Sequence, residues 1–363
     1  MTGLYIHLPF CSALCPYCDF AVVVGREPEH ERYVEALLAE HDALRWTATY
    51  ETVFLGGGTP SFVAPALLAR LIPGGAAEVS LEANPESVAP GRARAWAAAG
   101  VTRVSVGAQS FGDHVLRGLG RTHRAAAIAP AVEAVRSAGI EDVNLDLIYG
   151  GPSETAKDWT ASLREAVALR PTHVSCYALT IEERTAFGAA VAADRMPAPD
   201  EDALADRYER AIDVLGEAGF EQYEISNWSL PGRRCRHNLS AWRQDDYLGL
   251  GIGAHSHRAG HRWWNVRSLP AYLRDPARAR AGEEHLAPRA RAEEWAALRL
   301  RLLDPIDVAE LSARLDRDVT PVLQRLAGRG LLALDGSRAT LTTRGKLLEN
   351  VVTGELIAAT VGA

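Results

Sequence analysis

Residues 5–20 read YIHLPFCSALCPYCDF, and this stretch places Cys11, Cys15 and Cys18 within eight positions. Three thiolates on one tight loop can reach three corners of an iron–sulfur cube, because thiolates are the soft ligands that iron requires. The fourth iron would then keep an open coordination position for a small chelating molecule. The alternative is a zinc site with His7 as the fourth ligand, although the paired CxxC spacing typical of zinc is absent.

The other two of the five cysteines, Cys176 and Cys235, lie far along the chain. This distribution favours a metal site in a reducing compartment over a set of disulfides. The first ten residues lack the features of a secretory signal, and no apolar run is long enough to span a bilayer. We therefore expect a cytoplasmic protein without stable membrane insertion.

Composition limits the partners of the chain. Its 363 residues favour two domains, and a hydrophobic content of 47% supplies a large core. The formal net charge of -7 gives no general attraction to nucleic-acid phosphates or anionic lipids. We expect no nucleic-acid partner.

Short β-rich runs alternate with amphipathic stretches from residue 1 to about 228, which predicts repeated βα units around a parallel sheet, hence an α/β fold with a complete or partial barrel. The predicted strands are 4–8, 52–56, 78–83, 103–107, 142–148, 173–179 and 220–225. The predicted helices are 31–45, 90–99, 125–138, 155–169 and 202–218.

Polar and glycine motifs follow several of these strands, at 56–61, 82–85, 109–111 and 146–152. Ligands of parallel α/β folds bind at the carboxyl ends of the strands, so these segments are expected to converge on one mouth.

The alternation stops near residue 289, where three helix-like segments (290–303, 307–315, 320–328) precede a predicted hairpin at 330–343. This order resembles a winged-helix domain. Residues 285–363 carry 11 basic and 10 acidic residues, so DNA binding is not indicated and a packing or lid domain is preferred. The predicted division is a barrel at 1–228, a connecting segment at 229–284 and this small domain at 285–363.

With its cysteine loop and flanking residues, the chain resembles the radical S-adenosylmethionine superfamily, and within it the branch related to coproporphyrinogen III dehydrogenase. The resemblance implies a partial βα barrel with a 4Fe-4S cluster on Cys11, Cys15 and Cys18. It also implies S-adenosylmethionine on the fourth iron, cleaved by a reduced cluster to methionine and a 5′-deoxyadenosyl radical.

The same resemblance implies which residues contact S-adenosylmethionine. The glycine triplet within GGGTPS (56–61) corresponds to the family's methionine-binding segment, and its backbone permits close approach. The predicted contacts are Tyr5, Tyr17, Gly57, Gly58, Thr59, Glu82, Gln109, Arg121 and Asp146. Taken singly, each of these residues would be read as structural, but together, in the order that the family has them, they predict one site.

Two features separate the members of this branch. Phe20 stands where the porphyrinogen dehydrogenase has a fourth cysteine, and only ten residues precede Cys11, whereas that enzyme has an extension before its cluster loop. Both differences point away from that enzyme. The stretch CRHNLSAW at 235–242 is similar to the HNxxYW heme motif of the HemW family of heme chaperones, with Ala241 in place of the tyrosine. His237 is then the predicted heme ligand, because imidazole is a suitable axial ligand of iron, and His255 is a weaker candidate.

The resemblance thus implies a heme chaperone that binds the cluster, S-adenosylmethionine and heme, and passes heme to acceptor hemoproteins. A reductant protein such as flavodoxin or ferredoxin would supply electrons. The alternatives are oxygen-independent oxidative decarboxylation of coproporphyrinogen III, and radical chemistry on another substrate. No catalytic residue is assigned.

Overall fold

The structure, a computed structural model, describes residues 2–358. Its main feature is a single curved sheet, which contains twelve strands within the described residues, in the order β14-β13-β12-β11-β1-β4-β5-β6-β7-β8-β10-β9. The strands are β1 (Thr2–Leu8), β4 (Thr52–Gly57), β5 (Glu78–Ala83), β6 (Arg103–Gln109), β7 (Asp142–Tyr149), β8 (His173–Ala178), β9 (Glu221–Gln222), β10 (Asn227–Ser229), β11 (Asp246–Leu250), β12 (His255–Arg258), β13 (His261–Asn265) and β14 (Arg280–His285).

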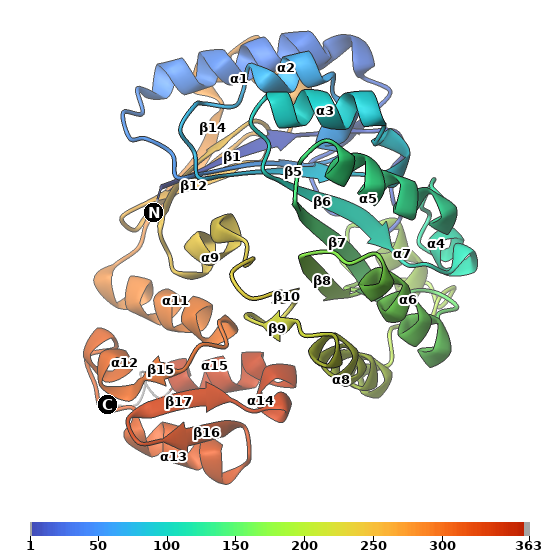
Figure 1. Ribbon diagram of the computed structural model, residues 1–363. Helices are drawn as coiled ribbons and strands as arrows, with labels where there is room; N and C mark the ends of the chain where they lie inside the picture. Colours follow the sequence, from blue (N-terminus) through green and yellow to red (C-terminus); the bar gives the residue numbers. More distant parts are fainter. Residues whose placement is uncertain (1, 359–363) are drawn as a thin grey trace.

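Strands β11, β1 and β4 to β8 are parallel, and helices cover their convex face (Figure 1). The predicted α/β architecture is confirmed, since six of the seven predicted strands and all five predicted helices are present within a few residues of their expected limits. The covering helices are α1 (His30–Leu44), α2 (Pro65–Ala69), α3 (Pro90–Ala98), α5 (Ile128–Ser137), α6 (Ala156–Ala168) and α8 (Glu201–Glu217).

The parallel strands have two chemically different faces, because successive side chains of a strand point to opposite sides. On β5, Val79 and Leu81 are buried in the core beneath the helices, whereas Ser80 and Glu82 line a cavity on the concave side. A parallel sheet that is covered by helices on both sides has apolar side chains on both faces. The alternating strands here therefore indicate a polar interior built for a ligand.

The prediction for residues 220–225 was wrong. Only the two-residue strand β9 forms there. It pairs in the antiparallel sense with β10, which begins at Asn227 and pairs antiparallel with β8. The segment 229–284 also has more structure than the connection expected from the sequence, because β11 to β14 extend the main sheet beside β1. This segment also contains α9 (Arg236–Trp242) and α10 (Leu269–Arg274).

The carboxyl-terminal part has its own apolar core, which includes Trp295, Leu323 and Leu326. The predicted hairpin is confirmed and joins a three-stranded sheet in the order β15-β17-β16. In Figure 1 this part lies below the open side of the curved sheet. Its elements are α11 (Pro288–Arg301), β15 (Ile306–Asp307), α12 (Val308–Arg314), α13 (Thr320–Gly328), β16 (Leu332–Asp335), β17 (Arg338–Leu341), α14 (Thr343–Leu347) and α15 (Glu349–Ala358).

Three smaller features surround the carboxyl ends of the strands. The short pair β2 (Phe10–Cys11) and β3 (Val23–Val24) closes the base of the cysteine loop. Helices α4 (Asp113–Gly118) and α7 (Ala186–Ala192) follow β6 and β8. Among the described helices, none has the length and apolar character needed to cross a membrane.

Candidate cofactor site

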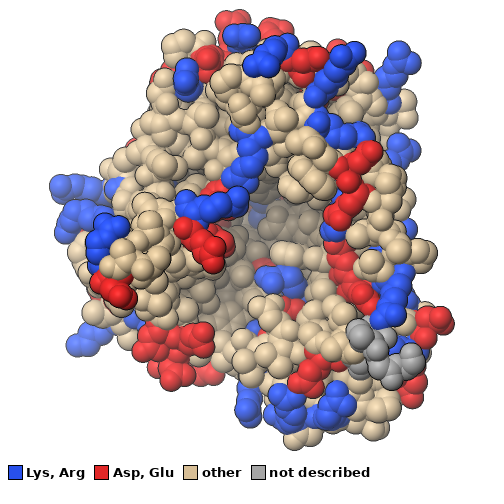
Figure 2. Space-filling model, turned by 180° about the vertical axis from the view of Figure 1, so that it is seen from behind, with Lys and Arg blue, Asp and Glu red and all other residues tan. Residues whose placement is uncertain are grey.

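A cavity of about 640 Å³ lies on the concave side of the sheet, and Figure 2 shows this side of the molecule hollowed at its centre, with charged side chains around the hollow. The volume is in the range of small-molecule sites. The cavity brings together the three cysteines and most of the predicted contacts to S-adenosylmethionine: Cys11, Cys15, Cys18, Tyr17, Gly57, Gly58, Thr59, Glu82, Gln109, Arg121 and Asp146.

The cysteine loop is held from two sides. At its base the β2–β3 pair fixes Cys11, and a turn in which the Cys18 N–H donates to the Cys15 carbonyl at 3.1 Å fixes the other end. The Thr59 hydroxyl donates to Cys11 Sγ at 3.6 Å, and Arg121 Nη1 donates to Cys15 Sγ at 3.4 Å. These hydrogen bonds stabilise the thiolate form of the cysteines. Burial has the opposite effect on Cys11 and raises the pKa of its thiol to about 11.

The geometry argues against zinc on this loop. Within residues 2–358, the ligand atoms of His261, Glu283 and His285 all lie within 4.8 Å of one another, whereas the three cysteine sulfurs do not. His7 is also engaged, because its Nε2 is hydrogen bonded to the Ala21 carbonyl at 2.7 Å and its Nδ1 to a tyrosine hydroxyl. A cube of four irons and four sulfides is larger than a single ion and suits the wider spacing.

Two glycines allow the loop and the sheet to approach each other. A Cβ atom on Gly58 would lie 2.8 Å from Cys11 Sγ and from the Pro9 carbonyl group. Gly57 has φ +117°, and a Cβ atom there would meet the His7 ring at 2.7 Å. A larger residue at either position would force the neighbouring atoms to move, the His7 ring at Gly57 and the Cys11 side chain and Pro9 backbone at Gly58.

Glu82 and Asp146 supply carboxyl groups to the cavity. Glu82 accepts the Gly57 N–H at 3.0 Å, and burial together with the nearby Asp146 raises its pKa to about 8. Asp146 accepts hydrogen bonds from the Ser105 hydroxyl at 2.5 Å and from Asn144 Nδ2 at 2.8 Å, while burial raises its pKa. Two partly buried carboxyl groups near each other suit a ligand with positive charge or hydroxyl donors.

Gln109 ends β6 in a strained conformation, with φ +53° beside a register shift in the pairing with β7. Its Oε1 is buried and has no hydrogen-bond partner within the described structure. A buried acceptor of this kind needs a partner, and the cavity is where a ligand would provide one.

Several cavity residues were not predicted from the sequence. Asn84 connects the two side chains that donate hydrogen bonds to the cysteine sulfurs. Its Oδ1 accepts from Arg121 Nη2 at 2.6 Å, and its Nδ2 donates to the Thr59 hydroxyl at 3.3 Å. Ser105 and Asn144 orient Asp146. The signal available in the sequence was the repeat of polar residues at every second position of successive strands.

Comparison with known proteins agrees with this geometry. A model of the radical SAM superfamily matches residues 5–166, and a model of the HemN C-terminal domain matches residues 286–348. The heme chaperone HemW of Mycobacterium tuberculosis is 41% identical over 374 aligned positions, which cover 98% of this chain and 94% of that protein. The chain belongs to the HemW family of the radical SAM superfamily.

Other members and one solved structure fit this assignment. The HemW of Lactococcus lactis is 32% identical, with 96% of this chain and 95% of that protein aligned. The structure of coproporphyrinogen III oxidase (HemN) from Escherichia coli superposes with a TM-score of 0.84 at 22% identity, covering 99% of this chain and 90% of that one. At this identity the likeness shows the fold alone.

Membership in the superfamily implies a 4Fe-4S cluster and S-adenosylmethionine, and the residues of this HemW-family chain fit both. Three thiols share one loop, two donors are placed on their sulfurs, and the unpartnered Gln109 oxygen lies in the same cavity. Tyr5, by contrast, does not line the cavity. Its hydroxyl is hydrogen bonded to His7 Nδ1 at 3.0 Å, so its contact with S-adenosylmethionine stays a prediction.

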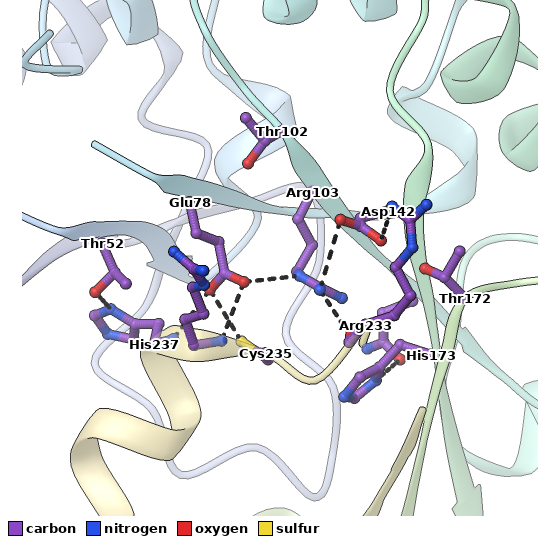
Figure 3. A network of polar contacts seen from close by, with 12 residues as sticks. Thr52, Glu78, Thr102, Arg103, Asp142, Thr172, His173, Arg233, Cys235 and His237 are labelled. Atoms are coloured by element: carbon purple, nitrogen blue, oxygen red, sulfur yellow. Dashed lines mark hydrogen bonds and ion pairs between the residues drawn. The ribbon is translucent and has the colours of Figure 1, made fainter. Parts of the chain in front are cut away.

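His237, the predicted heme ligand of the HemW-family motif, lies on α9 beside Thr52, the first residue of β4 (Figure 3). Its Nδ1 is 2.9 Å from the Thr52 hydroxyl, its ring stacks on Phe54 at 5.1 Å, and burial lowers its pKa to about 4. Asn238 lines the base of the cavity, whereas His237 itself does not. His255 lies on β12 against Trp264 and is also outside the cavity.

A buried polar network fixes α9 in place (Figure 3). Glu78 Oε1 accepts the backbone N–H of His237 and Oε2 that of Arg236, both at 3.0 Å. Arg103 pairs with Glu78 at 3.3 Å, and its Nη2 donates to the Arg233 carbonyl at 2.9 Å. Glu78 and Arg103 thus hold residues 233–237, which are more than 100 positions away in the sequence, against the amino ends of β5 and β6.

Proposed function

We propose that this protein is a heme chaperone that carries a 4Fe-4S cluster, binds S-adenosylmethionine and heme, and passes heme to acceptor hemoproteins. The observation that carries the proposal is the 41% identity to a protein named heme chaperone HemW over nearly the whole of both chains. The cavity supports it, because it joins the cysteine loop to the segment that contains the heme motif.

In this proposal Cys11, Cys15 and Cys18 hold the cluster, and Arg121 and Thr59 donate hydrogen bonds to the sulfurs. When bound, a reduced cluster supplies one electron to S-adenosylmethionine, and a flavodoxin- or ferredoxin-like protein would deliver it. The chain's own role is to bind and orient this ligand and to exclude water from it. The proposed contacts are Tyr5, Tyr17, Gly57, Gly58, Thr59, Glu82, Gln109, Arg121 and Asp146.

We propose His237 as a ligand of heme iron. Its lowered pKa keeps the imidazole neutral at physiological pH, which is the form that binds a metal. A histidine ligand usually donates its second ring N–H to a neighbouring acceptor, and the Thr52 hydroxyl beside Nδ1 can fill that role and leave Nε2 for iron. The location we propose is the cytoplasm, where reducing conditions keep thiols available.

The alternative function, oxidative decarboxylation of coproporphyrinogen III, receives support from the fold alone. Phe20 occupies the position of the fourth cysteine of that enzyme, which favours the chaperone.

Anaerobic reconstitution with iron and sulfide, followed by heme titration, tests the proposal. We expect the parent protein to bind both cofactors, and the Cys11/Cys15/Cys18→Ala variant to lose iron–sulfur absorption. The His237→Ala variant should lose the spectrum of histidine-coordinated heme, whereas His255→Ala, which tests the second candidate ligand, should keep it. A parent protein with an intact cluster and no affinity for heme would overturn the proposal, and anaerobic conversion of coproporphyrinogen would support the alternative.

A further inference from the structure

Large apolar side chains are exposed at the mouth of the cavity. Leu14 is 63% exposed, Phe20 69% and Tyr177 41%, and all three line the cavity. Leu14 and Phe20 belong to the cysteine loop and its exit, and Tyr177 is near the carboxyl end of β8. Several exposed apolar side chains around one cavity are unfavourable in water and mark a place where another molecule binds.

This exposure is concentrated at the mouth. Of the seven large hydrophobic residues that are exposed in residues 2–358, these three line the cavity and Val24 follows in the same loop region. The other three are Leu334, Leu348 and Val351, which belong to the separate carboxyl-terminal part.

Two exposed arginines stand beside this apolar surface. Arg184 Nη2 donates to the Asp19 carboxylate at 3.0 Å, and Arg267 Nη2 donates to the Asp19 carbonyl oxygen at 2.7 Å. Asp19 directly precedes Phe20, so both guanidinium groups are hydrogen bonded to the residue next to the aromatic ring. An apolar plane flanked by cations complements a flat apolar molecule that carries carboxylates at its edge.

The mouth is remote from His237. Thr52, which bonds His237, begins β4, and Gly57, which lines the cavity beside the cysteines, ends it. Five strand steps of about 3.3 Å separate them by roughly 17 Å. A ligand on Phe20 therefore occupies a different position from a ligand on His237.

We propose that the mouth is a heme-binding position separate from His237, in which Leu14, Phe20 and Tyr177 contact the porphyrin plane and Arg184 and Arg267 bind its carboxylates. The identity of the ligand rests on the proposed function. Heme bound there is exposed at the protein surface, where an acceptor hemoprotein can reach it.

Heme titration of cluster-loaded protein tests the apolar contacts. Phe20→Ala should weaken heme binding at the mouth roughly tenfold, and Leu14→Ala should weaken it less. Leu334→Ala, which removes an exposed leucine from the carboxyl-terminal part, is the matched control and should have no effect. Normal iron–sulfur absorption in each variant shows that the loop has folded. If Phe20→Ala does not fold, Leu14→Ala still tests the apolar contacts.

Heme dimethyl ester tests the charges. Arg184→Gln and Arg267→Gln should weaken heme severalfold and leave the affinity for the ester unchanged, whereas Arg278→Gln, at another exposed arginine, should affect neither ligand. Heme that still binds the His237→Ala variant, together with a Phe20→Ala variant that keeps only the histidine-coordinated heme, supports two positions. Equal heme binding by the parent and Phe20→Ala overturns this inference alone, whereas a parent that binds no heme overturns the proposed function.

Discussion

Gly58 and Cys11 are in such close contact that a Cβ atom on Gly58 would lie 2.8 Å from the Cys11 sulfur. The same atom would be 2.8 Å from the Pro9 carbonyl, so neither the side chain nor the backbone of the loop leaves room for it. The conformation of the cysteine loop thus depends on a residue 47 positions later in the chain.

We therefore expect Gly58→Ala to lower cluster incorporation severalfold, because the loop must move away from the sheet. Iron and sulfide per chain after anaerobic reconstitution measure this. Gly91→Ala is the control, since a Cβ atom there has no neighbour within 4 Å. Equal iron content in the two variants would contradict the prediction.

Asp146→Asn keeps the shape of the side chain and removes its charge. We expect normal cluster absorption and a weaker affinity for S-adenosylmethionine, by roughly tenfold or more, because hydrogen bonds to a charged group contribute about 1.5–3 kcal/mol. Equilibrium binding of S-adenosylmethionine to the cluster-loaded protein measures the effect. Asp142→Asn, at the other end of β7, should leave this affinity unchanged, and an unchanged affinity in Asp146→Asn would remove Asp146 from the site.

Glu78→Gln should destabilise the protein strongly. Glu78 pairs with the buried Arg103 and accepts two backbone N–H groups at the start of α9. Removal of one partner of a buried ion pair costs about 3–5 kcal/mol. Chemical denaturation measures the loss of unfolding free energy. Glu221→Gln is the control, because Glu221 is 3.8 Å from Arg234 near the surface, where such a pair contributes about 1 kcal/mol or less. Similar losses in both variants would show that the network does not stabilise the fold.

Glu40 predicts a pH dependence of stability. Burial raises its pKa from 4.5 to about 7, and it accepts hydrogen bonds from Asn265 and Gly251. Because the folded state holds this proton more tightly than the unfolded state, the contribution of Glu40 is complete below pH 4.5 and is lost as the pH rises to 7.

The expected loss is about 3 kcal/mol at most, at roughly 1.4 kcal/mol for each pH unit. Glu40→Gln cannot titrate, so the difference in unfolding free energy between the parent and this variant should shift in favour of the variant between pH 5 and pH 8. A constant difference over this range would show that Glu40 is ionised throughout.

The sequence predicted the parallel core because each strand from 52 to 178 has an apolar side that packs under its own neighbouring helix, which is local information. Residues 220–225 were wrongly predicted because their structure depends on distant contacts: the Tyr223 carbonyl accepts from the Leu303 N–H, and Glu224 forms an antiparallel bridge with Leu302. The strands β11 to β14 were missed for the same reason, since β11 is held by β1.

For the site, the order of the motifs predicted which residues would meet at the carboxyl ends of the strands. The partners that orient them, such as Asn84 and Ser105, look like ordinary polar strand residues and are identified only by their contacts. The position of His237 at the opposite end could not be predicted, because it depends on Glu78, which is 159 residues away in the sequence.

The position of β1 has a consequence for the order in which the protein forms. β1 lies between β4, which follows it by about 50 residues, and β11, whose Asp246 is the partner of Thr2. Such non-local pairing is slow because a long loop must close first. During synthesis, one edge of β1 stays unpaired until residue 250 has left the ribosome, so the strand that leads into the cysteine loop is enclosed long after it is made.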